Sequence, residues 1–207
     1  MGALQSDQFA EQLSNGAIPL DLRAPAQFAR GYVPGSICLQ FGRHDLGERA
    51  ELFLPKDQRY VLVMEPAALS AIAERLLQEA GYTVEGFLQG GLKGWTGPLE
   101  EIPVALVAEV HERLNRGEQL PLIDVREDFE YEWGHIGSAV NIPHGEVWQR
   151  AEALDKTTHY YVVCNDQVRS AAAASVLKRL GVTQLTLVLG GTVAWSDAGY
   201  PLTRTGS

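Results

Sequence analysis

Short apolar runs alternate with amphipathic segments along the 207-residue chain. In the second half, Leu122–Val125, Tyr160–Cys164 and Leu185–Leu189 are apolar runs of the length typical of strands buried on both faces. Ala108–Asn115 and Ser170–Leu180 have helical apolar spacing, and a glycine follows each of them closely as a stop signal. This alternation with short connections predicts an α/β fold, in which a mainly parallel central sheet is flanked by helices.

The same succession of segments occurs twice, at an offset of about 100 residues. The matched segments are Leu20–Arg23 with Ile123–Arg126, Gly31–Ser36 with Gly134–Ser138, Tyr60–Val63 with Tyr160–Val163, Ser70 with Ser170, Gly90–Gly91 with Gly190–Gly191, and Trp95 with Trp195. An ordered series of this length indicates a duplication. We therefore predict two domains, residues 1–100 and 101–207, with a boundary near Gly97–Val104, where two prolines interrupt regular structure.

Charge and composition exclude several classes of function. The net charge is −9, with 8 basic and 12 acidic residues up to residue 100 and 9 and 14 beyond it. An evenly acidic protein is a poor candidate for binding nucleic acid or an anionic membrane. No apolar stretch is long enough to span a membrane, and Met1–Ala10 lacks the pattern of a signal peptide. We expect a cytoplasmic protein that binds neither nucleic acid nor membrane.

The two cysteines, Cys38 and Cys164, stand at non-equivalent places in the two copies. This arrangement argues against a disulfide framework and against a zinc site, and we expect no metal and no cofactor. Cys38 follows an isoleucine on a predicted buried strand, which favours a core residue.

Cys164 leaves a predicted buried strand, and Arg169 enters the next helix five positions later. Ligands of open α/β sheets bind outside the carboxyl ends of the strands, so this loop is the candidate active site. A loop this tight can point backbone N–H groups inward, and these groups, the helix dipole and Arg169 would favour a thiolate. We expect the substrate to contact the remaining residues of the segment, namely Asn165, Asp166, Gln167, Val168 and Ser170. Position alone favours a buried structural cysteine, but the loop setting and the arginine reverse this preference and favour a nucleophile.

The order of these motifs resembles that of the rhodanese-like domain, and the whole chain is similar to a tandem of two such domains. The motifs that carry the resemblance are Ile123–Arg126, Gly134–Ile136, Asn141–Pro143, the loop from Cys164 to Ser170, Leu189–Gly191 and Trp195. The resemblance implies a sulfurtransferase, in which Cys164 takes a sulfane sulfur as a persulfide from a small donor or a protein persulfide. A thiol or cyanide would then accept the sulfur, and Arg169 would close the loop.

The loop departs from the family pattern at three positions. Gln167 stands where the family often has glycine, Asn165 stands where it often has a basic residue, and Asp166 places a negative charge at the mouth. A side chain at the glycine position could cost on the order of 1 kcal/mol. Together these changes predict weak activity with doubly charged thiosulfate, and favour a neutral or protein-bound persulfide donor.

The first copy lacks the chemistry of the second. Met64 stands at the cysteine position, and Leu69 replaces the arginine. A thioether cannot ionise, so we expect the first domain to be catalytically inactive and to have a structural role.

Several other polar residues of the second copy admit two interpretations. The group Asp124, Arg126, Glu130, Glu132 and His135 could supply a general acid or base, but a structural ion-pair network is the favoured interpretation.

Further residues lie at the edges of the predicted site. His144 and Trp148 could line the pocket mouth, whereas His159 precedes its strand at the far end. Tyr131 and Trp133 could be exposed contacts for a partner, but half-buried packing is the favoured interpretation. Trp95 and Trp195 occur in both copies, which favours packing over catalysis.

Three functions remain open from the sequence. The first is sulfur transfer through Cys164, and the second is a non-catalytic binding or regulatory module, which Asp166, Gln167 and Met64 favour. The third is a phosphatase or arsenate reductase of the same fold class. It ranks last, because the loop between Cys164 and Arg169 is one residue shorter than in those enzymes.

Overall fold

A computed structural model describes residues 2–42 and 44–204 of the chain. The chain divides between Glu101 and Ile102 into two compact units, which we call the N-terminal and C-terminal domains. Each domain contains a five-stranded sheet, and its described strand pairs are all parallel. Among the described residues, none of the helices has the length and apolarity needed to cross a lipid bilayer.

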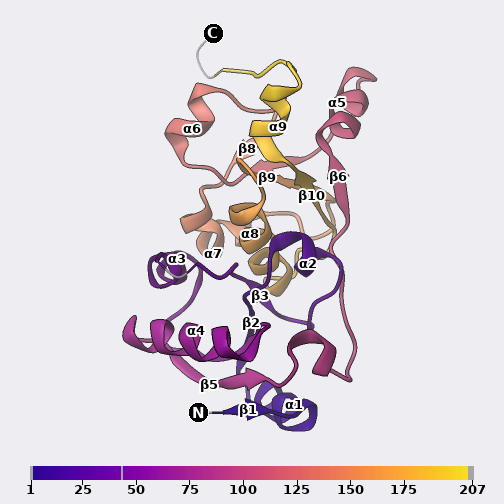
Figure 1. The fold of residues 1–207 in the computed structure, drawn as a ribbon. Coiled ribbons are helices and arrows are strands. Elements are labelled where there is room, and N and C mark those ends of the chain that lie inside the picture. Colours follow the sequence, from indigo (N-terminus) through magenta and orange to yellow (C-terminus); the bar gives the residue numbers. More distant parts are fainter. Residues whose placement is uncertain (1, 43, 205–207) are drawn as a thin grey trace. The chain divides into compact units, whose positions relative to one another are not determined.

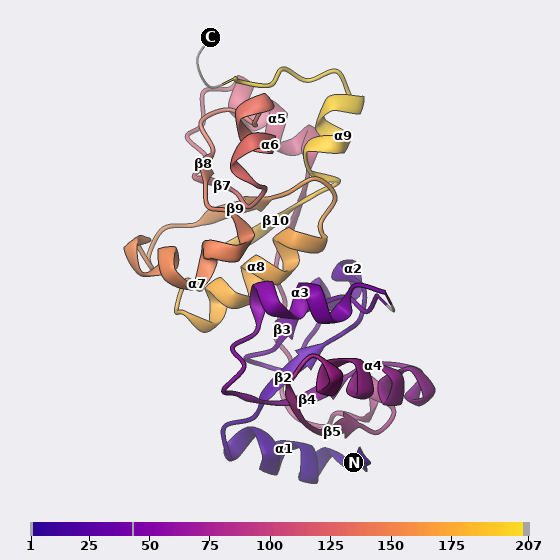
Figure 2. The ribbon, with the colours of Figure 1, turned by 90° about the vertical axis from the view of Figure 1, so that its left-hand side faces the viewer.

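The N-terminal domain arranges its sheet in the order β1-β5-β4-β2-β3. Its elements are β1 (Ala3–Leu4), α1 (Ser6–Ser14), β2 (Ile18–Asp21), α2 (Pro25–Ala29), β3 (Ile37–Cys38), α3 (Leu46–Phe53), β4 (Arg59–Val63), α4 (Ala67–Glu79), β5 (Thr83–Leu88) and the 3₁₀ turn η1 (Gly91–Gly94). Helices α3 and α4 pack together on one side of the sheet, and α1 lies on the other (Figure 2).

The C-terminal domain repeats this order as β6-β10-β9-β7-β8. Its elements are β6 (Val104–Leu106), α5 (Val107–Asn115), β7 (Leu122–Asp124), α6 (Asp128–Trp133), β8 (Val140–Asn141), η2 (His144–Glu146), α7 (Val147–Arg150), η3 (Ala151–Ala153), β9 (Tyr160–Val163), α8 (Val168–Arg179), β10 (Leu185–Leu189) and α9 (Gly191–Asp197). Helices α7 and α8 cover one face of the sheet, and α5 and α9 cover the other (Figure 1).

The duplication predicted from the sequence is therefore confirmed, since both domains are α/β and their sheets have the same strand order. Two isolated antiparallel bridges repeat as well, Tyr32 with Glu100 and His135 with Thr203. In each domain this bridge ties the segment after the second helix to the chain that leaves the domain. The two domains therefore match in individual residue pairs as well as in the order of their strands, as expected for a duplicated unit.

The first strand of each domain was missing from the prediction. Residues 97–104 were assigned to a linker, but Val104–Leu106 form β6, which pairs in register with Leu187–Leu189 of β10. β1 contains two residues and β6 three, and runs this short carry no measurable periodicity. Both strands form by pairing with a long neighbour, a tertiary effect that local pattern does not contain.

Trp95 and Trp195 have the packing role that their recurrence predicted. The indole N–H of Trp95 donates to the carbonyl of Pro98 at 2.9 Å, and that of Trp195 to Pro201 at 3.0 Å. Trp195 is almost fully buried, and its ring meets the Tyr200 ring edge to face. The two tryptophans thus anchor the end of each repeat to its core.

Candidate functional site

Cys164 lies at the carboxyl end of β9, the central strand of its sheet. Parallel strands deliver the residues that follow them to one edge, where open α/β sheets bind ligands. The chain turns through Asn165, Asp166 and Gln167 and enters α8 at Val168. Cys164 is fully buried, so its sulfur faces the interior of this turn.

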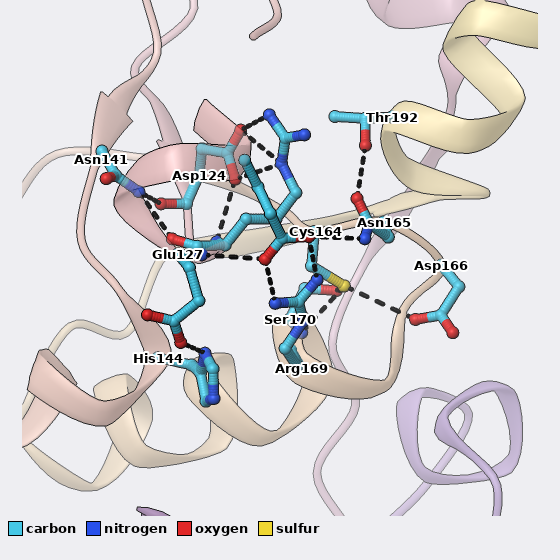
Figure 3. Close-up of polar contacts among 12 residues, drawn as sticks. Asp124, Glu127, Asn141, His144, Cys164, Asn165, Asp166, Arg169, Ser170 and Thr192 are labelled. Carbon is cyan, nitrogen blue, oxygen red and sulfur yellow. Dashed lines mark hydrogen bonds and ion pairs between the residues drawn. The ribbon is translucent and has the colours of Figure 1, made fainter. Parts of the chain in front are cut away.

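Two residues of the segment surround the sulfur of Cys164 (Figure 3). The backbone N–H of Ser170, in the first turn of α8, donates to Sγ at 3.3 Å. The Ser170 hydroxyl oxygen lies 3.4 Å from Sγ, and the Oδ1 atom of Asp166 lies at 3.8 Å. A backbone donor and the amino end of a twelve-residue helix both favour negative charge on sulfur.

The carboxylate of Asp166 turns inward onto its own loop. Its Oδ1 atom accepts hydrogen bonds from the backbone N–H groups of Gln167, at 2.7 Å, and Val168, at 3.0 Å. The sequence predicted that inward-pointing amides would cradle an anion on the sulfur. In the structure, these two amides instead bind a carboxylate that belongs to the protein.

Arg169 is committed to an ion pair that the sequence did not predict. Its guanidinium donates to both carboxylate oxygens of Glu130, at 2.6 and 2.8 Å. These bonds hold the pKa of Glu130 at about 2, although partial burial opposes the shift. The same bonds raise the pKa of Arg169, and Cys164 and Asp166 raise it further through their charges. The positive charge is thus near the loop but shared with Glu130.

Asn165 links the loop to α6 and α9 through hydrogen bonds of its side-chain amide. Its amide nitrogen donates to Glu130 at 2.7 Å, and its amide oxygen accepts from the Thr192 hydroxyl at 2.9 Å. The Thr192 backbone N–H also donates to the Cys164 carbonyl at 2.9 Å. A side chain at Gly191 would bring Cβ within 2.1 Å of that same carbonyl oxygen, so glycine is required for the approach.

Gln167 has a backbone conformation that side chains rarely adopt. Its φ is 148°, the only positive value among the described non-glycine residues. This position departs from the pattern of the family that the chain resembles, in which glycine is common here. The structure supplies the physical reason, since the turn between Cys164 and α8 needs a residue in the region where glycine is unstrained.

The chain was compared with known proteins, and the model of one family, the rhodanese-like domain, matches it twice, over residues 5–98 and 106–198. These two matches cover most of both domains. The chain belongs to the rhodanese-like domain family.

Relatives of this tandem rhodanese-like chain include two proteins of Bacillus subtilis (strain 168). The putative sulfur carrier protein YrkF is 33% identical over 134 residues, which cover 64% of this chain and 72% of that protein. The putative sulfurtransferase YtwF is 36% identical over 101 residues, 49% of this chain and 97% of its own. A crystal structure of a rhodanese-related protein from Thermoplasma volcanium has 32% identity and a TM-score of 0.45, and it covers 50% of this chain and 99% of its own.

The remaining polar candidates of this rhodanese-like domain divide between site and scaffold. Arg126 donates to both carboxylate oxygens of Asp124, at 2.7 to 3.0 Å, and to the Gly134 carbonyl at 2.8 Å. The predicted ion-pair network is therefore confirmed for this pair. Glu130 differs, because it joins the active-site loop through Arg169. Glu130 is one of three acidic residues of α6, and its partner Arg169 is 39 residues away, so no signal in the sequence distinguished it.

Three histidines of the C-terminal domain, His135, His144 and His159, contact residues other than Cys164. His135 is buried and stacks on the ring of Tyr131 at 3.9 Å. His159, as predicted, precedes its strand at the far end and contacts the Thr186 hydroxyl. His144 is buried beside Glu127, with Nδ1 3.2 Å from that carboxylate, and burial lowers its pKa. These contacts give the three histidines structural partners.

A pocket of about 450 Å³ lies beside the loop, between α6, α9 and the segment that follows α9. It is lined by Arg126, Phe129, Glu130, Trp133, Gly134, Thr192, Ser196, Leu202 and Arg204. Trp133 is 85% exposed and Phe129 66%, so the expectation of half-buried packing was wrong for Trp133. It was right for Tyr131, whose hydroxyl bonds to the Ala139 carbonyl. Glu130 and Thr192 both line the pocket and hold the loop, which places the two features side by side.

The first rhodanese-like domain has the framework of the second without a cysteine at the start of the loop. Met64 follows β4, the central strand, and is buried. Leu69 lies in the first turn of α4, where the second domain has Arg169. Cys38 lies on β3, fully buried as predicted, and burial raises the pKa of its thiol well above the usual value. That shift makes Cys38 a poor nucleophile.

Proposed function

We propose that the C-terminal domain is a sulfurtransferase that carries a sulfane sulfur as a persulfide on Cys164. The observation that carries the proposal is the Ser170 N–H, which donates to Sγ at the amino end of α8. This arrangement stabilises a sulfur anion, the reactive form in thiol chemistry. Membership of the rhodanese-like family and relatives named as a sulfur carrier and a sulfurtransferase support the same conclusion.

The reaction has two displacement steps. The Cys164 thiolate attacks the outer sulfur of the donor, the donor S–S bond breaks, and the donor leaves as a thiolate that takes up a proton. An acceptor, either a thiol or cyanide, then attacks the outer sulfur of the Cys164 persulfide and releases the Cys164 thiolate. No net oxidation occurs, because the sulfane sulfur and its oxidation state pass unchanged from donor to acceptor. A free thiol of this kind fits a reducing compartment such as the cytoplasm.

Arg169 has a positioning role in this proposal, together with the loop residues Asn165, Gln167 and Val168. The Glu130–Arg169 pair and the Asn165–Thr192 bond fix the loop so that the Ser170 amide of α8 faces the sulfur. The pocket beside the loop holds the organic group of the donor or the acceptor. Its exposed aromatic walls, Phe129 and Trp133, suit an apolar group.

The N-terminal domain is proposed to be inactive in sulfur transfer. Met64 cannot form a thiolate, and its loop continues with a proline that has no N–H to donate. The domain keeps the β-sheet and the core of the family, so a structural role is the remaining use of that framework.

Intact mass spectrometry tests the proposal directly. The protein is incubated with a low-molecular-weight organic persulfide or with thiosulfate, and the mass of each product is recorded. We expect a gain of one sulfur atom with the persulfide, retained by Cys38→Ser and abolished by Cys164→Ser. A gain retained by Cys164→Ser contradicts the proposal. No gain with any donor favours the alternative of a non-catalytic binding module, and Cys164-dependent hydrolysis of an aryl phosphate favours a phosphatase.

A further inference from the structure

A single carboxylate oxygen, from the exposed residue Asp166, caps the turn that follows Cys164. The Oδ1 atom of Asp166 accepts from the Gln167 and Val168 N–H groups and lies 3.8 Å from the Cys164 sulfur (Figure 3). An anionic group transferred to or from Cys164 would need donors at this same place. The loop amides therefore bind a carboxylate of the protein itself, at the place where an anionic donor would need them.

The charges around the sulfur add to this effect. Arg169 is the cation of the loop, and both of its terminal nitrogens bind Glu130. The two carboxylates of Asp166 and Glu130 carry two negative charges, and the guanidinium of Arg169 carries one positive charge, before any thiolate forms. The immediate surroundings of Cys164 carry net negative charge, and they repel an incoming dianion.

We infer that Asp166 is the residue that sets donor specificity at this site, by occupying the loop amides and excluding sulfur donors that are charged next to the transferred sulfur. The inference rests on the proposed sulfurtransferase function and names its substrate class. The donors accepted are organic persulfides, which react in the protonated form R–S–SH and so bring no charge on the sulfur that is transferred. Thiosulfate, whose sulfane sulfur is bonded directly to a sulfonate group, is rejected.

The transfer step balances with such a donor. The Cys164 thiolate forms a bond to the outer sulfur of R–S–SH, the bond between the two donor sulfurs breaks, and R–S⁻ leaves. The negative charge moves from Cys164 to the leaving thiolate and so away from Asp166, and that thiolate then takes a proton from water. With thiosulfate the leaving group is sulfite, and two negative charges must approach Asp166 before the bond forms.

The first experiment measures a ratio of rate constants. For each variant of the full chain, kcat/KM is determined with thiosulfate and with glutathione persulfide, and cyanide is the acceptor in both assays. Asp166→Asn keeps a side-chain oxygen that can accept from the two amides but removes its charge, whereas Asp166→Ala leaves the amides open. We expect the ratio of thiosulfate to persulfide to rise about 100-fold in both variants. Asp197→Asn, at the exposed end of α9, removes a charge elsewhere in the domain and is expected to leave the ratio within about threefold.

The second experiment needs no sulfur transfer, so it separates this inference from the proposed function. In a Cys38→Ser background, Cys164 is alkylated with neutral iodoacetamide or with anionic iodoacetate. With Asp166 present, the preference for iodoacetamide is expected to exceed that of a small free thiol. Asp166→Asn is expected to lower the preference about tenfold. Circular dichroism confirms that each variant is folded.

The outcomes are distinct. An unchanged thiosulfate-to-persulfide ratio in both Asp166 variants, with sulfur still loaded on Cys164, overturns the specificity role alone. Failure of every donor to load Cys164, together with an Asp166-dependent alkylation preference, overturns the proposed function but leaves the electrostatic screen in place. An alkylation preference that Asp166→Asn does not change overturns the inference whatever the donors do.

Discussion

The carboxylate of Glu130 receives the guanidinium of Arg169 through two hydrogen bonds, although 39 residues separate them in the sequence. The side chains are 16% and 24% exposed, so the pair is mostly shielded from water. Paired Arg–carboxylate geometry of this kind fixes direction as well as distance. The pair links α6 to the first turn of α8, and it thereby links the wall of the pocket to the active-site loop.

Replacement of Glu130 by glutamine is expected to destabilise the C-terminal domain by about 2 kcal/mol at neutral pH, since it breaks charge-assisted bonds. The pKa of Glu130 is held at about 2, below its usual 4.5. A lowered pKa contributes stability in full above the usual value, and this contribution is lost as the pH falls from 4.5 towards 2. The difference between Glu130→Gln and the parent protein should therefore shrink over that interval.

Urea unfolding at a series of pH values measures this difference. Glu132→Gln is the matched control, because it removes the same charge from an exposed position on the same helix. It is expected to change stability by less than about 0.5 kcal/mol. Two results would contradict a stabilising Glu130–Arg169 ion pair. One is an equal loss of unfolding free energy in both variants, and the other is a loss in Glu130→Gln that does not diminish as the pH falls towards 2.

Replacement of Gln167 by glycine is expected to stabilise the domain. Its φ of 148° strains any side chain, whereas glycine adopts this conformation freely. The expected gain is about 1 kcal/mol after allowance for the greater entropy of glycine in the unfolded chain. Gln149→Gly, in the helix α7, is the control, and it should lose about 1 kcal/mol. Thermal unfolding distinguishes the two, and a loss in both variants would show that the Gln167 conformation is not strained.

The sequence predicted the framework of the site more completely than its interior. Two α/β domains, the strand–loop–helix segment and the contrast of Met64 with Cys164 all follow from the repeat, because a duplicated pattern is compared with itself. The inward turn of the Asp166 carboxylate could not be predicted. A loop side chain can face solvent or its own backbone at similar cost, and the tertiary setting decides between them.

Contacts between residues far apart in the chain were the second feature of the site that the sequence could not predict. From the sequence, Glu130 was grouped with Asp124 and Arg126, because they are close in the chain. In the fold, Asp124 and Arg126 form a buried pair with each other, and Glu130 binds Arg169 and Asn165 instead. Spacing along one helix could not identify a partner on another, and the same limit explains why Trp133 was expected to be half-buried.

Replacement of Trp133 by alanine tests the pocket. Trp133 is 85% exposed, so its loss should leave the fold intact. If the pocket holds the organic group of an acceptor, KM for an aromatic thiol is expected to rise about tenfold, the equivalent of ~1.4 kcal/mol. Cyanide has no organic group, and its KM should stay the same. Leu106→Ala, at another exposed apolar position, is the control. Equal changes for both acceptors would argue that Trp133 acts on the loop rather than on the ligand.

A cysteine at position 64 tests whether the fold alone is sufficient for the chemistry. In Met64→Cys combined with Cys164→Ser, the new thiol follows the central strand of its sheet, as Cys164 does. Its loop continues with Glu65 and Pro66 and has Leu69 in place of the arginine, so it has one acidic residue, as the Cys164 loop does, but one N–H fewer and no cation. We expect no gain of sulfur from an organic persulfide under conditions that load the parent protein. Adding Leu69→Arg supplies the missing charge without restoring the missing amide, and we expect that variant to stay unloaded as well. Intact mass measures both, and loading of either variant would mean that the end of the central strand and the helix after it are enough, and that the loop sequence of the C-terminal domain is not required.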